Sequence, residues 1–174
     1  TVSLSTSSTA TEGTDYTDGS GNIDDITISA GSTTGTVNFT PTDDSVYEGN
    51  ETATIAISGV SGADATENGT QTVTITVTEN ESAPTITLAR SAASIDENSG
   101  STVTLTATIS GVTDSAVTVA LSTSGTATEG TDYGTISDIT ISAGDTTGTA
   151  TVDPTDDRVY EGDETAGISI SSVS

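Results

Sequence analysis

The chain has 174 residues, with 26 Asp and Glu against two Lys and Arg, and its net charge is −24. So acidic a chain repels polyanions, which excludes electrostatic binding to nucleic acid or to an anionic membrane and leaves cations as the expected charged partners. It contains no Cys, so there is no disulfide framework, and no stretch approaches the ~20 apolar residues of a membrane span, so we expect no membrane insertion.

The chain contains an internal repeat. Residues 1–16 (TVSLSTSSTATEGTDY) match residues 118–133 (TVALSTSGTATEGTDY), and residues 26–61 match residues 139–174. The repeat is about as long as one small sandwich domain. We therefore predict a first domain over 1–81 that lacks its first strands, a linker over 82–84, and a second domain over 85–174 that lacks its last strand.

Apolar residues alternate with Thr and Ser along most of the chain, which is typical of β-strands with one buried face. About seven antiparallel strands per repeat favour an all-β fold of two tandem two-sheet sandwiches. In the first copy the alternation predicts strands through Val2 and Leu4, Ile26 and Ile28, Val37 and Phe39, and Ile55 and Ile57. The remaining strands are expected at 71–78, 85–90, 102–110, 116–123, 135–142, 147–153 and 165–171.

One acidic stretch occurs twice, at 42–51 (TDDSVYEGNE) and 155–164 (TDDRVYEGDE). Each copy places two adjacent Asp and two Glu in a short loop with a Gly at its turn. Two like charges ~4 Å apart repel by about 4 kcal/mol at an effective dielectric near 20, so a counter-charge is expected. Ca²⁺ suits such a loop because it accepts six to eight oxygen ligands in irregular geometry. The simpler alternative is a solvated acidic turn.

A second acidic segment, 18–24 (DGSGNID), only partly matches an EF-hand loop, because Ser29 stands where a bidentate Glu belongs. A plain turn is the expected structure there. The four tyrosines, Tyr16, Tyr47, Tyr133 and Tyr160, are expected in the core or at its corners.

The string from Gly125 through Thr-Glu-Gly-Thr-Asp132-Tyr133, then Ile-Ser-Ala-Gly, Asp156-Asp157 and Glu161-Gly-Asp-Glu164, resembles a Calx-beta domain, and the first copy carries the matching string from Thr9 to Glu51. The resemblance spans nearly the whole chain. It implies immunoglobulin-like antiparallel sandwiches that bind Ca²⁺ in loops at one end. Such domains occur in the cytosolic region of sodium–calcium exchangers and as tandem repeats in matrix, adhesion and bacterial surface proteins.

The resemblance also implies a set of metal ligands. The family often ends its last strand with an acidic run, which here reads Glu79-Asn80-Glu81, with Asn in one acidic position. The expected ligands in the first copy are Asp15, Asp43, Asp44, Glu48, Glu51, Glu79 and Glu81, and in the second Glu97, Asp132, Asp156, Asp157, Glu161 and Glu164.

The preferred functional hypothesis is a calcium-binding structural repeat of a long secreted or cell-surface adhesin, matrix or filament protein, in which Ca²⁺ makes the repeats rigid. The alternatives are a calcium-dependent binding module for a glycan or protein, and a calcium-sensor domain. An enzyme is not expected, because the chain has no His, Cys or Lys and few aromatic residues to line a pocket.

Two incomplete sandwiches would leave open sheet edges, and such edges pair readily with other strands. We expect the partners to be neighbouring repeats or copies of the chain arranged head to tail, with strand complementation between them. Half of a core is then expected on the first domain, from Val2, Leu4, Ile26, Ile28, Val37 and Phe39.

Overall fold

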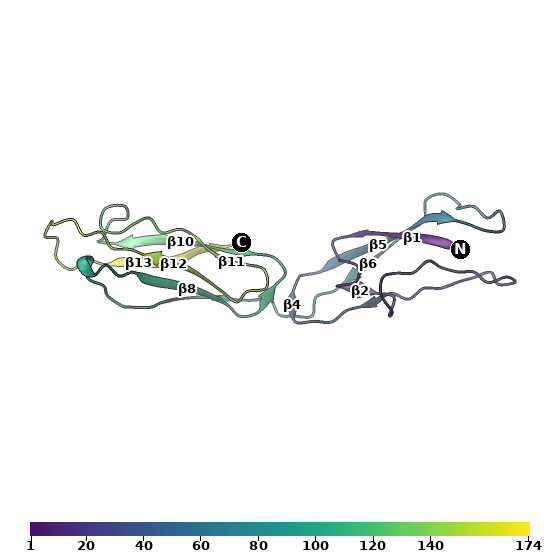
Figure 1. Cartoon of the computed structure of the whole chain (residues 1–174), viewed down its shortest axis with the longest axis horizontal. Helices are drawn as coiled ribbons and strands as arrows, with labels where there is room; N and C mark the ends of the chain where they lie inside the picture. Colours follow the sequence, from purple (N-terminus) through teal and green to yellow (C-terminus); the bar gives the residue numbers. More distant parts are fainter. The chain divides into compact units, whose positions relative to one another are not determined.

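The computed structural model describes residues 1–174 and consists of β-strands with one short 3₁₀ turn, η1 (Glu97–Ser99) (Figure 1). The all-β prediction is therefore confirmed. The chain forms two compact units, one of Thr1–Asp44 with Glu48–Asn80 and one of Ser45–Tyr47 with Glu81–Ser174. In this structure no helix has the length and the apolar composition that crossing a membrane requires.

The second unit is a sandwich of two three-stranded antiparallel sheets. The first has the order β11 (Ile139–Ile141), β10 (Val117–Gly125) and β13 (Ala166–Val173). The second has the order β12 (Thr147–Val152), β8 (Val103–Ile109) and β7 (Ile86–Arg90). In addition, β9 (Val112–Thr113) pairs in parallel with β4 (Val46–Tyr47).

The core of the second unit is formed by apolar residues that alternate with polar residues along its strands. Every apolar residue of β8 is buried, while the Thr residues between them point away, as the pleat of a strand requires. The buried core comprises Val103, Leu105, Ala107, Ile109, Val119, Tyr133, Ile139, Ile141 and Val152. The two sheets thus bury their apolar faces against each other.

The first unit contains one three-stranded antiparallel sheet, with the order β1 (Val2–Ser8), β5 (Glu51–Val60) and β6 (Thr72–Val77). A short ladder joins β2 (Tyr16–Thr17) to β3 (Thr40–Pro41). Its buried core is small, with Ala10, Tyr16 and Ala53 at the centre. The ring of Phe39 stacks on Tyr16 with centroids 4.7 Å apart.

Two strands predicted for the first unit do not form. Ile26 makes a single bridge to Val2, Ile28 lies outside any strand, and the segment from Val37 to Phe39 belongs to no ladder. The matching segments of the second unit are the strands β11 and β12, and β12 pairs with β8. The first unit has no counterpart of β8, so the same alternating pattern lacks the partner strand that would turn it into a ladder.

The prediction for the tyrosines holds for one pair of equivalent positions only. Tyr16 and Tyr133, which follow the Thr-Glu-Gly-Thr-Asp motif, are both buried. Tyr47 is half-buried, and Tyr160 is 96% exposed, so the expectation of a core position is wrong for Tyr160.

Candidate metal centre

The Thr-Glu-Gly-Thr-Asp motif builds the same turn in both units and holds its Asp in place. In the first unit the Thr11 amide donates to Asp15 Oδ2 at 2.5 Å, and the Asp15 amide donates to the Thr11 carbonyl at 2.9 Å. In the second unit the Thr128 amide donates to Asp132 Oδ2 at 2.6 Å, and the Asp132 amide donates to the Thr128 carbonyl at 2.9 Å. In each turn one carboxylate oxygen of the Asp accepts a hydrogen bond from the turn itself, which fixes the position of the carboxylate.

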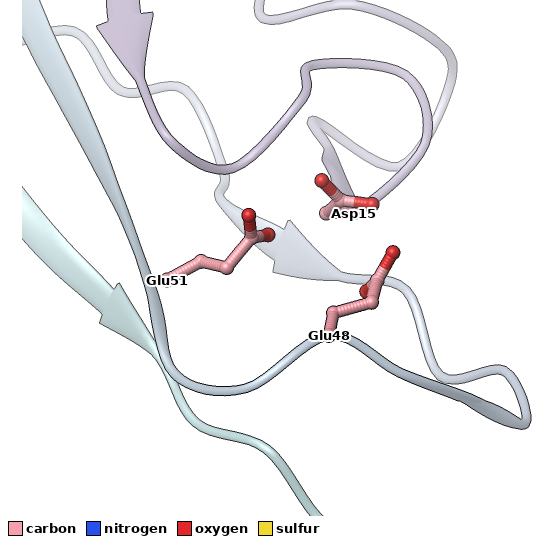
Figure 2. A group of neighbouring side chains, drawn as sticks. All are labelled: Asp15, Glu48 and Glu51. Atoms are coloured by element: carbon pink, nitrogen blue, oxygen red, sulfur yellow. The ribbon is translucent and has the colours of Figure 1, made fainter. Parts of the chain in front are cut away.

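The acidic loop brings two further carboxylates to this turn in the first unit. Gly49 adopts φ 78°, a left-handed conformation that glycine takes without strain, and it lies between Glu48 and Glu51. Figure 2 shows the side chains of Asp15, Glu48 and Glu51 converging from the turn and the loop. Carboxylate oxygens of these three residues all lie within 4.8 Å of one another.

The second unit repeats the arrangement. Gly162 adopts φ 80°, and carboxylate oxygens of Asp132, Glu161 and Glu164 all lie within 4.8 Å of one another. We call the two groups the first triad (Asp15, Glu48, Glu51) and the second triad (Asp132, Glu161, Glu164). Each triad joins residues more than twenty positions apart in sequence, so the fold itself assembles it.

The triads fit the oxygen chemistry of Ca²⁺. A Ca²⁺–oxygen bond is about 2.3–2.6 Å long, so two oxygens on one ion are at most about 5 Å apart, which accommodates the 4.8 Å limit of the triads. All of the donors are hard carboxylate oxygens, which this ion prefers. Three protein ligands leave the remaining coordination positions for water or for other carboxylates.

The electrostatics of the second triad also favour a cation. Loss of hydration raises the pKa of the Glu161 carboxyl above its ordinary value, and the negative charges of Asp132, Asp157, Glu164 and Glu97 raise it further. The pKa of the Glu164 carboxyl is raised in the same direction, first by loss of hydration and then by Asp132. Both carboxyls are therefore harder to ionise than isolated ones, and a bound cation would relieve that repulsion.

Two other predicted ligands of the first copy, Glu79 and Asp43, make hydrogen bonds that hold its acidic loop. Glu79 Oε2 accepts hydrogen bonds from the amides of Glu48 and Gly49 at 2.6 and 2.7 Å, so it anchors the loop that carries the triad. Asp43 Oδ1 accepts a hydrogen bond from the Asn80 side chain at 2.8 Å. Asp43, Asp44, Glu79 and Glu81 lie outside the first triad, and their role as ligands stays a prediction.

The remaining predicted ligands of the second unit also lie outside its triad. Glu97 is in η1, where its charge acts on both Glu161 and Glu164. Asp157 Oδ1 accepts a hydrogen bond from the Val159 amide at 2.7 Å, which shapes the acidic loop. For Asp156, as for Glu97 and Asp157, ligation stays a prediction.

The two triads differ in their surroundings. Glu48 and Glu51 are half-buried, whereas the equivalent Glu161 and Glu164 are exposed. In the first unit, Glu79 lies two residues beyond the end of β6 and also binds the loop through its backbone, since its amide donates to Asn50 Oδ1 at 2.9 Å.

Sequence reasoning missed one pair of structural carboxylates. Glu129 Oε1 accepts a hydrogen bond from the Ile136 amide at 2.8 Å, and Glu129 Oε2 accepts one from the Thr123 hydroxyl at 3.1 Å. Glu12 makes the corresponding contacts with Ile23 and Thr6. These residues fasten the loop after the turn to the neighbouring strand. The sequence did offer a signal for this role, because Glu12 and Glu129 belong to the same Thr-Glu-Gly-Thr-Asp motif as the Asp of each triad.

The segment resembling an EF-hand loop is a local turn, as expected. Asp18 Oδ1 accepts the amides of Ser20 and Gly21 and the Ser20 hydroxyl. These hydrogen bonds, led by the Ser20 amide, lower the pKa of the Asp18 carboxyl.

Comparison with known proteins agrees with the resemblance noted from the motif. The family model of the Calx-beta domain matches residues 1–81 and again residues 79–174. Searches among curated proteins and among solved structures gave no match for the chain. The family matches cover the whole chain, so it belongs to the Calx-beta family and carries two tandem copies of that domain.

Proposed function

We propose that this chain is a calcium-binding structural repeat pair from a long secreted or cell-surface adhesin, matrix or filament protein. The observation that carries the proposal is the second occurrence of the same carboxylate triad. Asp15, Glu48 and Glu51 recur as Asp132, Glu161 and Glu164, while other loop residues differ, with Ser45 replaced by Arg158. Repulsion among the carboxylates opposes each arrangement unless a cation offsets it.

In this proposal the ion fastens the acidic loop to the Thr-Glu-Gly-Thr-Asp turn. Asp15 and Asp132 are held by amides of their own turns, so they offer a fixed oxygen. Glu48 and Glu51, or Glu161 and Glu164, bring the loop to that oxygen. Because the ion binds only the folded arrangement, each site would stabilise its unit by about 2.7 kcal/mol at a hundredfold excess of Ca²⁺ over Kd.

The location outside the cell is supported by composition and repetition. The chain is a tandem repeat that is rich in Thr and Ser and carries only two basic residues. Affinity separates this proposal from a calcium sensor, since extracellular modules bind at roughly 10⁻⁴–10⁻³ M and sensors at 10⁻⁷–10⁻⁵ M. The proposal further holds that Ca²⁺ stiffens successive repeats, and small-angle scattering with and without the ion tests that part.

A thermal melt with matched variants tests the proposal. The unmodified chain should melt at a clearly higher temperature in Ca²⁺ than in chelator. Glu161→Gln should remove most of the gain in the second unit, because it takes a charge from the triad. Asp114→Asn is the control, since Asp114 is exposed and belongs to neither triad. Equal losses in the two variants would indicate diffuse screening and would contradict a defined site.

A further inference from the structure

The acidic loop of the first unit is held at its turn by a carboxylate from outside the loop. Glu79 lies beyond the end of β6, and its Oε2 accepts hydrogen bonds from the amides of Glu48 and Gly49 at 2.6 and 2.7 Å. Successive backbone N–H groups that point at one anion form a nest, which offsets a negative charge much as a cation does. The charge of Glu79 is therefore offset by backbone groups of the loop itself.

The same part of the chain binds the acidic stretch at two further points. The Glu79 amide donates to Asn50 Oδ1 at 2.9 Å, and Asn80 Nδ2 donates to Asp43 Oδ1 at 2.8 Å. An ionised carboxylate only accepts hydrogen bonds, so the amide nitrogen of Asn80 faces Asp43. We call Glu79 and Asn80 the clamp, because together they bind both ends of the acidic stretch 42–51.

The hydrogen bonds of Glu79 compete with ligation of a metal ion. A carboxylate oxygen has about two lone pairs, and Oε2 of Glu79 already accepts two amides. Its Oε1 accepts the Asn80 amide at 2.9 Å. The oxygens that converge within 4.8 Å of one another are those of Asp15, Glu48 and Glu51, whose side chains point toward one another in Figure 2. Glu79 thus contacts the backbone of the loop, whereas the side chains of the loop reach the triad.

The clamp acts on a residue that also belongs to the first triad. Glu48 presents its side chain to the triad and its amide to Glu79, so a single residue connects the clamp to the metal site. A loop that is fixed before the ion binds loses less conformational entropy on binding, which raises the affinity. Residues that hold metal ligands in place contribute about 10–100-fold to metal affinity without touching the metal.

We propose that Glu79 and Asn80 hold the acidic loop of the first unit in its metal-binding shape before an ion binds, and that Glu79 is a positioning residue and not a ligand. This inference rests on the proposed calcium-binding function. It gives Glu79 a role different from the one that the family resemblance implies. The oxygen of Glu79 then matters more than its charge, because the two loop amides need an acceptor.

Calorimetric titration with Ca²⁺ separates the two roles. The parent is the full chain with Glu161→Gln, which removes the second triad, so that the titration reports the first unit. Glu79→Ala removes the acceptor and should weaken binding by about 10–100-fold. Glu79→Gln keeps an acceptor oxygen for the loop amides and loses only a screened charge, so it should restore the affinity to within about fivefold of the parent. Glu48→Gln, which changes a triad ligand, should abolish binding in the first unit.

A second measurement needs no ion. Amide hydrogen exchange of Glu48 and Gly49 is followed by NMR in chelator. Glu79→Ala should accelerate the exchange of both amides by at least about tenfold, and Glu79→Gln should keep it slow. The amides of β5 should stay protected in every variant, which shows that the first unit remains folded. Glu67→Ala is the matched control and should leave affinity and exchange unchanged, because Glu67 also accepts a backbone amide, that of Gln71, but in another loop.

Two results would overturn the proposal. If Glu79→Gln abolishes binding as Glu48→Gln does, Glu79 is a ligand. If the amides of Glu48 and Gly49 exchange equally fast with and without the Glu79 carboxylate, no clamp exists in the metal-free loop. Failure of the proposed function has a different signature, because the parent would then show no saturable Ca²⁺ binding, while the exchange measurement would still decide whether the clamp exists.

Discussion

Truncation of the two equivalent isoleucines should destabilise the two units very differently. Ile141 is fully buried beneath the second sheet, so Ile141→Ala removes buried methyl groups and leaves a cavity. Such changes cost about 2–5 kcal/mol of unfolding free energy. Ile28 is 42% exposed, so Ile28→Ala loses only part of the ~1.5–3 kcal/mol that full burial of such a side chain contributes, and it creates no closed cavity. We expect a cost of about 1 kcal/mol or less.

Differential scanning calorimetry of the full chain is the assay, because two units can unfold in separate transitions. A domain of about this size shifts its Tm by roughly 4–8 °C per kcal/mol, so Ile141→Ala should lower the transition of the second unit by at least about 8 °C. Ile28→Ala should move the transition of the first unit by less. Equal shifts would refute the reasoning, because they would mean that both isoleucines are covered alike in solution.

Because the pKa values of Glu161 and Glu164 are raised in the folded state, the metal-free folded chain holds more protons than the unfolded chain above pH 4.5, and its stability should fall as pH rises through the two raised pKa values. With Ca²⁺ present, stability should instead increase with pH. Thermal melts of dialysed protein at several pH values measure both trends. Glu79→Ala should cost the first unit about 1–3 kcal/mol in denaturant unfolding, because two loop amides lose their acceptor, whereas Glu67→Ala in an exposed loop should cost less. Gly148→Ala should cost the second unit about 1–3 kcal/mol in denaturant unfolding, because the added Cβ would overlap the Thr140 carbonyl. Gly134→Ala is the control and should be tolerated, because the atom nearest to its added Cβ is 3.9 Å away.

Most of the strands of the second unit could be predicted from alternation alone. The expected strand at 102–110 is β8 (Val103–Ile109), and the one at 147–153 is β12 (Thr147–Val152). The same pattern failed at Val37 and Phe39, because alternation reports which face a residue can bury and says nothing of whether a partner strand is present. The two-residue strands β4 and β9 were also out of reach, since so short a segment carries no period.

The candidate site could be predicted as a region but not as a set of ligands. The twin acidic stretches identified both loops, and the resemblance added Asp15 and Asp132. Which carboxylates converge depends on the left-handed turns at Gly49 and Gly162, and these direct the two Glu residues of each loop toward the Asp. Spacing along the sequence also does not reveal that Asp43 accepts a hydrogen bond from the Asn80 side chain and lies outside the triad.

Calcium binding by the triads is the central claim, and isothermal titration of the metal-free chain with Ca²⁺ tests it most directly. The account predicts saturable binding with at least one ion per unit. Glu48→Gln should abolish binding in the first unit, Glu161→Gln should abolish it in the second, and the double variant should bind at neither. Absence of saturable binding up to about 10 mM, ten times the weakest Kd expected of extracellular modules, would contradict the account. So would a double variant that binds as the unmodified chain does.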